Sequence, residues 1–172
     1  MLEQDLILAR SGDPAAFERL VTPHLKGLYG FLARRTGNLA EDVYQETLLG
    51  AWRNIRGFGG NASFKTWLYA IAGKRSMDAL RKQARQPAFS ELDEQNGQEG
   101  FEDAAARALD IRDSLGRLGT EDQTLLYLVY TQGLSQEEAA VILGIPEGTV
   151  KSRLHRLRAV LKSQLGGKAD GT

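Results

Sequence analysis

Hydrophobic residues recur at helical spacing along most of the chain, most clearly near its C-terminal end. Between residues 149 and 161 they fall on one stripe, at i, i+4, i+7 and i+11: Val150, Leu154, Leu157 and Leu161. This spacing is typical of a helix face buried against a partner. The other faces of this helix carry a hydroxyl and basic groups, from Lys151, Ser152, Arg153, His155, Arg156 and Arg158.

A shorter helix is predicted just before it. Ser135 and Glu138 have the spacing of a capping box, and Gly144 provides the backbone freedom with which a helix ends. Ile145 and Pro146 then form a turn, and the second helix starts at about residue 149. Two short helices joined by a tight turn, the second with arginines and hydroxyls outside, indicate a helix-turn-helix for the DNA major groove. The competing interpretation, a solvated basic helix surface, leaves the capped helix and the turn unexplained.

Caps, prolines and glycines divide the N-terminal half into helices. The predicted segments are 2–10, a helix from residue 14, then 23–35, 38–55 and 63–86. Their predicted N-caps include Asp13, which precedes Pro14 at a first helical position, together with Asn38 and Ser63. A glycine-rich loop over 56–62 separates the last two helices.

The helix over 38–55 presents two different faces. The first is mostly hydrophobic and is predicted to belong to the core: Tyr44, Leu48, Ala51, Trp52 and Ile55. The second is polar with one leucine set into it: Asp42, Gln45, Glu46, Leu49 and Arg53. An exposed leucine ringed by hydrogen-bonding side chains favours a protein-docking surface. A solvated face with one stray leucine fits these residues as well, because single exposed apolar residues are common.

Aromatic and basic side chains alternate in the segment 58–85. They are Phe58, Phe64, Lys65, Trp67, Tyr69, Lys74, Arg75, Arg81, Lys82 and Arg85. Bases of single-stranded DNA stack on aromatic rings while cations follow the phosphates. Most of these rings must also supply the hydrophobic stripe of the helix, so we expect at most one or two of them to meet DNA.

The segment 86–103 is polar and acidic and is interrupted by Pro87, Gly97 and Gly100, which predicts a flexible linker. After it we expect a helix over 104–118. Thr120 with Gln123 is the predicted cap of the next helix, whose apolar residues complete a small core: Leu125, Leu126, Leu128 and Val129. The predicted fold is therefore all-α, with a helical domain over 1–86, an acidic linker over 87–103, and a helix-turn-helix domain over 104–165.

Composition narrows the possible functions. The chain of 172 residues has no cysteine, which excludes disulfides, thiolate chemistry and cysteine-based zinc sites. No apolar run approaches the length of a membrane span, so we expect a soluble, cytoplasmic protein without membrane insertion. The net charge is zero, but 52–85 holds eight Lys and Arg against the single acid Asp78, whereas 90–122 holds ten acids against three arginines.

Candidate chemistry for an enzyme is weak. His24 and His155 are far apart in sequence without a convincing nucleophile, and we expect His24 at the surface and His155 facing DNA. Asp42 and Glu46 are an i, i+4 carboxylate pair without further acidic ligands nearby, so neither a metal site nor a cofactor is predicted.

Three segments, in order, resemble those of bacterial sigma factors of the extracytoplasmic-function (ECF) class, which have only the second and fourth conserved regions. Residues 42–47, followed by Ala51 and Trp52, resemble the helix that docks on the clamp helices of the polymerase beta-prime subunit. Residues 63–68 resemble the element that melts and reads the minus-ten promoter motif. Residues 144–154 closely resemble the minus-thirty-five reader. The likeness spans about residues 13–161.

The resemblance implies recruitment of RNA polymerase to promoters rather than catalysis, in a stress or envelope response. Its implied partners are core RNA polymerase (beta-prime clamp helices and beta flap), promoter DNA and an anti-sigma factor. The implied polymerase contacts are Asp42, Gln45, Glu46, Leu49 and Arg53. The implied minus-ten contacts are Phe58, Asn61, Ser63, Lys65, Trp67, Lys74 and Arg75. The implied minus-thirty-five contacts are Thr149, Lys151, Ser152, Arg153, His155 and Arg156.

Two departures from the family pattern limit what can be carried over. The helix before the helix-turn-helix starts with Leu118-Gly119-Thr120 instead of a proline-containing sequence, and the loop over 57–60 is unusually rich in glycine. The preferred minus-ten base therefore does not follow from the resemblance. An autonomous helix-turn-helix regulator is the main alternative, and it leaves residues 41–85 without a role.

Overall fold

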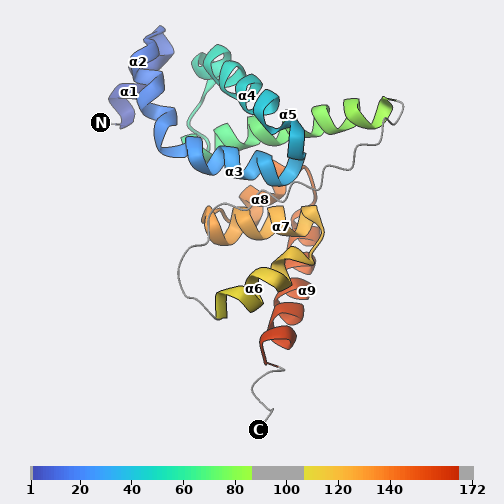
Figure 1. Cartoon of the computed structure of the whole chain (residues 1–172). Coiled ribbons are helices and arrows are strands. Elements are labelled where there is room, and N and C mark those ends of the chain that lie inside the picture. The colour runs from blue at the N-terminus through green and yellow to red at the C-terminus, as the bar shows by residue number, and fades with distance from the viewer. Residues whose placement is uncertain (1, 87–106, 167–172) are drawn as a thin grey trace. The chain divides into compact units, whose positions relative to one another are not determined.

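The computed structural model describes residues 2–86 and 107–166, where the backbone forms only helices and turns (Figure 1). These residues divide into two compact units. The first contains the N-terminal helices as far as residue 86, and the second contains most of the remaining helical segments. The predicted linker over 87–103 lies outside the described residues. No helix within the described ranges is long and apolar enough to cross a membrane.

The first unit has five α-helices, which 3₁₀ turns join at three points. The helices are α1 Leu2–Ser11, α2 Pro14–Val21, α3 Leu25–Thr36, α4 Ala40–Asn54 and α5 Phe64–Arg85. The 3₁₀ turns are Thr22–His24, Gly37–Leu39 and Ile55–Gly57. α1 packs along α2, and α3, α4 and α5 pack against one another (Figure 1).

Two of the predicted N-caps in this unit are confirmed and one is wrong. The Asp13 carboxylate accepts hydrogen bonds from the Ala15 and Ala16 amides at 2.9 and 3.4 Å, and the Ser63 hydroxyl accepts from the Thr66 amide at 3.0 Å. Asn38 caps nothing, because residues 37–39 form a 3₁₀ turn that runs directly into α4 without an extended residue.

The core of the first unit lies where α3, α4 and α5 meet. Leu28, Phe31 and Leu32 of α3 are fully buried, and Phe31 stacks on Tyr69 of α5 with ring centroids 5.8 Å apart. Full burial of a leucine or phenylalanine side chain stabilises a fold by about 1.5–3 kcal/mol. These side chains therefore fix the three helices against one another.

The predicted core face of α4 is partly wrong. The buried residues of this helix are small ones: Ala40, Val43, Thr47, Gly50 and Ala51. Tyr44, Leu48 and Trp52 are only half-buried. At Gly50 the nearest facing atoms belong to α5 side chains, since a Cβ there would lie 3.3 Å from the Arg75 guanidinium and 3.7 Å from the Ile71 side chain.

The second unit contains four α-helices. They are α6 Arg107–Gly116, α7 Thr120–Leu126, α8 Gln136–Leu143 and α9 Glu147–Gly166. A π-helical turn over Tyr127–Thr131 extends α7, and Gly133, with φ of 69°, redirects the chain toward α8. The predicted hydrophobic stripe of α9 is confirmed for three of its four residues, since Val150 and Leu154 are 0% exposed and Leu157 is 1% exposed, whereas Leu161 is half-buried.

The predicted capping box before α8 is also confirmed. The Ser135 amide donates to the Glu138 carboxylate at 2.7 Å, and the Glu138 amide donates to the Ser135 hydroxyl at 3.1 Å. Gly144 takes a φ of 67° where α8 ends, as expected of a terminating glycine. α9 begins two residues earlier than predicted, because the Pro146 carbonyl already accepts from the Thr149 and Val150 amides at 3.0 and 3.2 Å.

The predicted cap of α7 is wrong. Gly119 takes the extended N-cap position, and Thr120 is already the first helical residue. The Gln123 side chain donates to the Leu118 carbonyl at 2.8 Å and stabilises the turn instead of completing a capping box. The Thr120 carbonyl accepts a hydrogen bond from the Thr124 hydroxyl at 2.7 Å.

Candidate protein and nucleic-acid interfaces

The predicted docking face of α4 is exposed along its whole length. All five of its residues face solvent: Asp42, Gln45, Glu46, Leu49 and Arg53. Leu49 keeps 52% of its surface exposed. Gln45 donates to the Glu41 carboxylate one turn earlier, at 3.0 Å, which orients its amide along the helix. The face therefore offers an apolar side chain within a frame of polar ones.

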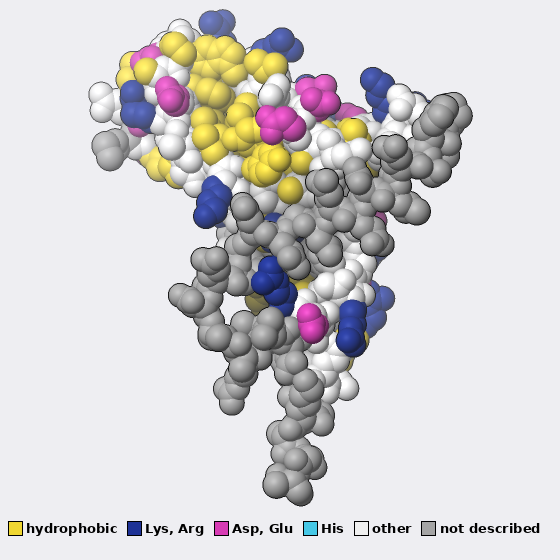
Figure 2. All heavy atoms as spheres, viewed as in Figure 1, with side chains coloured by type: hydrophobic (Ala, Val, Ile, Leu, Met, Phe, Trp, Pro, Cys, Tyr) yellow, Lys and Arg dark blue, Asp and Glu magenta, His cyan; other side chains and the backbone are white. Residues whose placement is uncertain are grey.

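A hydrophobic surface lies beside this face. The sequence analysis missed this surface because it assigned Tyr44 and Trp52 to the core. Tyr44 contacts Tyr29 of α3 edge-on at 5.5 Å, and Trp52 contacts Phe17 of α2 in the same manner at 5.1 Å. Figure 2 shows hydrophobic side chains gathered over the region of α4, with acidic and basic side chains around them. Burial, followed by the charge of Glu41, raises the pKa of Tyr44. Its phenol therefore stays neutral at physiological pH.

The loop before α5 is anchored by an aromatic cluster. Phe58 packs against Trp67 at 5.2 Å and against Phe64 at 6.0 Å, and it is only 5% exposed. The ring is enclosed by these two others, and its assignment as a DNA contact stays a prediction. Trp67 is half-buried and keeps part of its surface accessible.

The remaining predicted minus-ten residues lie on the loop and along α5. Asn61 and Ser63 are exposed, although the Ser63 hydroxyl is engaged in capping α5. The Lys65 ammonium lies over the Tyr69 ring, 5.8 Å from its centroid. Lys74 and Arg75 are exposed, and the Arg75 guanidinium lies across α4 at Gly50, 3.3 Å from where a Cβ would be. The basic side chains continue along α5 as exposed residues Arg81, Lys82 and Arg85.

His24 does not lie freely at the surface as expected. It is half-buried, and its ring is 6.0 Å from that of Phe64 at the start of α5. Burial, and then the positive charge of Lys65, lowers the pKa of His24. The imidazole is therefore neutral at pH 7 and adds no charge to this surface.

The predicted minus-thirty-five residues share the outer surface of α9. Lys151, Ser152, His155 and Arg156 are exposed, and Thr149 and Arg153 are half-exposed. The Lys151 ammonium pairs with Glu147 one turn earlier at 2.9 Å. The Ser152 hydroxyl donates to the Thr149 carbonyl at 3.1 Å. These local contacts orient the polar surface of the helix.

Two arginines of this surface are paired with acids of α7. Arg153 donates to the Glu121 carboxylate at 2.8 Å, and Arg156 donates to Asp122 at 3.0 Å. These four residues line an open hollow together with Gly119 and Thr120. Further along α9, Arg158 donates to the Tyr130 hydroxyl at 2.6 Å. Sequence reasoning missed both acids, because it treated them only as members of the acidic block.

In the part of the chain that the structure describes, no three His, Asp or Glu side chains come together as a metal site would require. What the described units offer are an apolar–polar helix face, an aromatic loop with a basic helix, and a second basic helix with forked donors.

Comparison with known proteins matches both units. Residues 20–86 match the family model of sigma-70 region 2, and residues 108–161 match that of sigma-70 region 4. The chain is 33% identical to the ECF RNA polymerase sigma factor SigW of Bacillus subtilis, over 96% of this chain and 97% of SigW.

Solved structures are similar as well. CnrH, in complex with the cytosolic domain of CnrY, has a TM-score of 0.62 at 28% identity, covering 96% of this chain and 97% of CnrH. The sigma factor RpoE of Bartonella quintana, in complex with the anti-sigma factor NepR, has a TM-score of 0.64 at 27% identity, covering 90% of this chain and 98% of RpoE. The helical architecture of the described units therefore has experimental counterparts.

Proposed function

The chain belongs to the ECF RNA polymerase sigma factors, with sigma-70 regions 2 and 4, and we propose that it binds core RNA polymerase and directs it to two-element promoters. Proteins of this family are initiation factors and not enzymes. We assign polymerase docking and minus-ten recognition to residues 1–86 and minus-thirty-five recognition to residues 104–165. The cytoplasm, where polymerase and promoters are found, is its proposed place of action.

The exposed face of α4 supports the polymerase-docking assignment. A leucine that is 52% exposed and surrounded by polar side chains combines apolar contact area with a hydrogen-bonding rim. The adjacent Tyr29 and Tyr44 extend the apolar area, so the contact is not limited to one side chain. We propose the clamp helices of the beta-prime subunit as the partner of α4, and the beta flap as a second contact.

The loop over 59–62 and the exposed side of α5 support capture of the opened strand. Asn61 is an exposed polar side chain of the loop, and Trp67 in the first turn of α5 is half-buried. Lys74 and Arg75 lie further along α5 and are placed to follow phosphates. Extruding a base from the duplex costs a few kcal/mol. Stacking on an aromatic ring and neutralisation of the phosphates together offset this cost.

α9 supports duplex recognition. Its buried stripe fixes it in the second unit, and its exposed surface carries the arginines, which can read guanine in the major groove with two hydrogen bonds each. Each such contact contributes about 1–3 kcal/mol of discrimination between bases. The observation that carries the whole proposal is the order of the two sigma regions on two separate compact units.

We also propose control by an anti-sigma factor in a stress or envelope response. The similar structure of RpoE was solved with the anti-sigma factor NepR. The hydrophobic surface around Tyr29, Tyr44 and Trp52 is exposed enough to be covered by such a partner. Covering it would also block the neighbouring face of α4.

Paired substitutions test this division of labour. Arg153→Ala with Arg156→Ala should weaken binding to minus-thirty-five duplex by about tenfold or more while leaving affinity for core polymerase intact. Gln45→Ala with Leu49→Ala should weaken binding to core polymerase and leave affinity for the duplex intact, since it removes the centre of the α4 face. Pull-down of core polymerase and anisotropy titration of labelled duplex measure the two affinities. Loss of both affinities in either double variant would contradict the proposal.

A further inference from the structure

α1 lies before the residues that match sigma-70 region 2, which begin at residue 20. The match therefore gives this helix no role. The structure nevertheless ties it firmly to the rest of the first unit: Ala9 is 0% exposed, and the α1 backbone packs along α2 and beside the turn over Ile55–Gly57. A helix that is attached both to α2 and to the segment before α5 restrains the position of that segment relative to α2.

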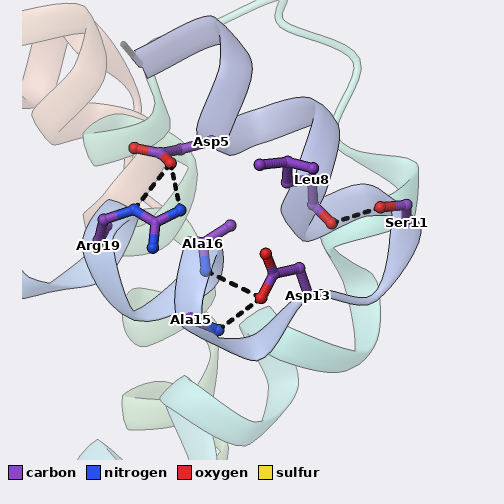
Figure 3. Close-up of polar contacts among 7 residues, drawn as sticks. All are labelled: Asp5, Leu8, Ser11, Asp13, Ala15, Ala16 and Arg19. Atoms are coloured by element: carbon purple, nitrogen blue, oxygen red, sulfur yellow. Dashed lines mark hydrogen bonds and ion pairs between the residues drawn. The ribbon is translucent and has the colours of Figure 1, made fainter.

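The first attachment is to α2. The Arg19 guanidinium donates twice to the Asp5 carboxylate, from Nε at 2.9 Å and from Nη2 at 2.7 Å (Figure 3). At the other end of α1, the Asp13 amide donates to the Leu8 carbonyl at 3.0 Å. The Asp13 side chain meanwhile caps α2 (Figure 3). Both ends of α1 are thus fixed against α2.

The second attachment is to the loop before α5. Arg10, in the last turn of α1, donates from Nη2 to the backbone carbonyl of Phe58. The Phe58 amide donates to the Ile55 carbonyl at 3.1 Å, and its ring packs against Trp67. Phe58 is therefore held through its ring by α5, through its amide by the preceding turn, and through its carbonyl by α1.

The loop needs such an anchor because residues 59–62, which follow Phe58, are held by few contacts with the rest of the unit. Residues 59–62 are all exposed. Two of them are glycines, and Gly60 has a φ of 76°. Ordering glycines costs more conformational entropy than ordering other residues. The path of the loop is therefore set at its two ends, at the Phe58 carbonyl and at the Ser63 cap of α5.

We propose that Arg10 is a positioning residue for minus-ten recognition: by holding the Phe58 carbonyl, α1 sets the direction in which the loop over 59–62 presents Asn61 to the opened strand. This inference rests on the proposed function of the loop. It assigns a role in promoter selectivity to a helix outside the matched sigma regions, and it involves no contact of Arg10 with DNA.

Arg10→Gln tests the proposal, with Arg34→Gln as the matched control. Arg34 also donates to a backbone carbonyl, that of Gly30 at 2.9 Å, but this bond stays within α3. Loss of one such hydrogen bond raises the detached population of the loop about 2- to 10-fold. The anchor itself is measured without DNA, by acrylamide quenching of Trp67 in a Trp52→Phe background, where release of Phe58 uncovers the indole.

Function is measured with the full chain, Trp52 intact, and core polymerase on a library of promoters. Arg10→Gln should increase Trp67 quenching and reduce discrimination among minus-ten sequences by about 2- to 10-fold. Its minus-thirty-five preference should equal that of the wild type, and Arg34→Gln should match the wild type in both readouts.

Unchanged quenching, or increased quenching with an unchanged minus-ten profile, would overturn the proposal. The proposal would also be overturned if the minus-thirty-five preference changed as much as the minus-ten preference, since that would indicate general damage to the protein. If the wild type itself produced no sequence-dependent start sites, the proposed function would fail instead, and the quenching result would still report on the anchor.

Discussion

At the scale of single residues, two carboxylates of α7 pair with the arginines of α9 that we propose bind DNA, and we expect them to compete with DNA for these arginines. Glu121 and Asp122 occupy Arg153 and Arg156 in the absence of DNA. Exposed ion pairs of this kind contribute only about 0–1 kcal/mol, so a phosphate or a guanine edge can replace the carboxylates. The released carboxylates then lie close to the polyanion. We therefore expect these acids to weaken binding to every DNA sequence.

Removal of the two acids tests this expectation. Glu121→Gln with Asp122→Asn should raise affinity for random-sequence duplex about fivefold at low salt, because two negative charges leave the DNA-facing surface. The gain should shrink as salt increases. Anisotropy titration of the full chain at several salt concentrations measures it. Asp113→Asn, an exposed acid of α6, is the control for loss of charge alone. Equal or weaker binding by the double variant would show that the acids position the arginines instead of masking them.

These acid–arginine pairs also mark a limit of residue-level prediction. The partners are separated by 32 and 34 positions in the sequence. No local pattern links positions so far apart, and the acids looked like part of a solvated acidic segment. The basic surface of α9 was predictable from the periodicity of that helix. The pairing of its arginines with acids of α7 was not.

At the scale of elements, the capping box before α8 fixes the start of the helix-turn-helix. Ser135→Ala removes the hydroxyl that accepts from the Glu138 amide, and it should lower the free energy of unfolding of the second unit by about 1 kcal/mol. For a unit of this size the melting temperature should fall by about 4–8 °C. Circular dichroism during thermal unfolding measures the change.

The matched control for this substitution is Ser163→Ala, at an exposed position within α9. Alanine has a higher helix propensity than serine, so this change should leave the stability equal or slightly higher. A similar loss of stability in both variants would mean that the capping box contributes little to the second unit.

Capping motifs succeeded or failed in prediction according to the backbone before them. Asp13 and Ser63 cap their helices because their ψ angles, 109° and 153°, are extended. Asn38 and Thr120 have a Glu or Gln three residues on, as a capping box requires, but a 3₁₀ turn precedes α4 and Gly119 takes the extended position before α7. The spacing alone does not determine the backbone angle on which a cap depends.

Helix rotation shows the same limit for α4. The pattern offered two adjacent stripes, and the larger side chains of Tyr44, Leu48 and Trp52 favoured one of them as the core. The small residues are buried instead, and at Gly50 the nearest facing atoms are those of the Arg75 and Ile71 side chains of α5. The aromatic residues were left to pair at the surface. The position of the helix was predictable, and its rotation depended on a partner more than twenty residues away in the chain.

At the scale of the whole molecule, the sequence predicted the all-α class, the helix-turn-helix and the order of the two sigma regions. The all-α class and the helix-turn-helix follow from periodicity and capping patterns, and the order of the two regions follows from the resemblance of three segments to those of the family. The roles of the individual contact residues stay predictions, including that of Phe58, although its ring is buried. Zero net charge does not argue against DNA binding here, because the charges are segregated along the sequence: residues 52–85 hold eight Lys and Arg against the single acid Asp78.

The central claim is that one chain joins core polymerase to a promoter. Run-off transcription with core RNA polymerase on a supercoiled promoter library, with and without the protein, tests it most directly. We predict new, sequence-dependent start sites only when both components are present. A protein that shifts duplex DNA by itself but starts no transcription would contradict the claim and would instead indicate an autonomous helix-turn-helix regulator.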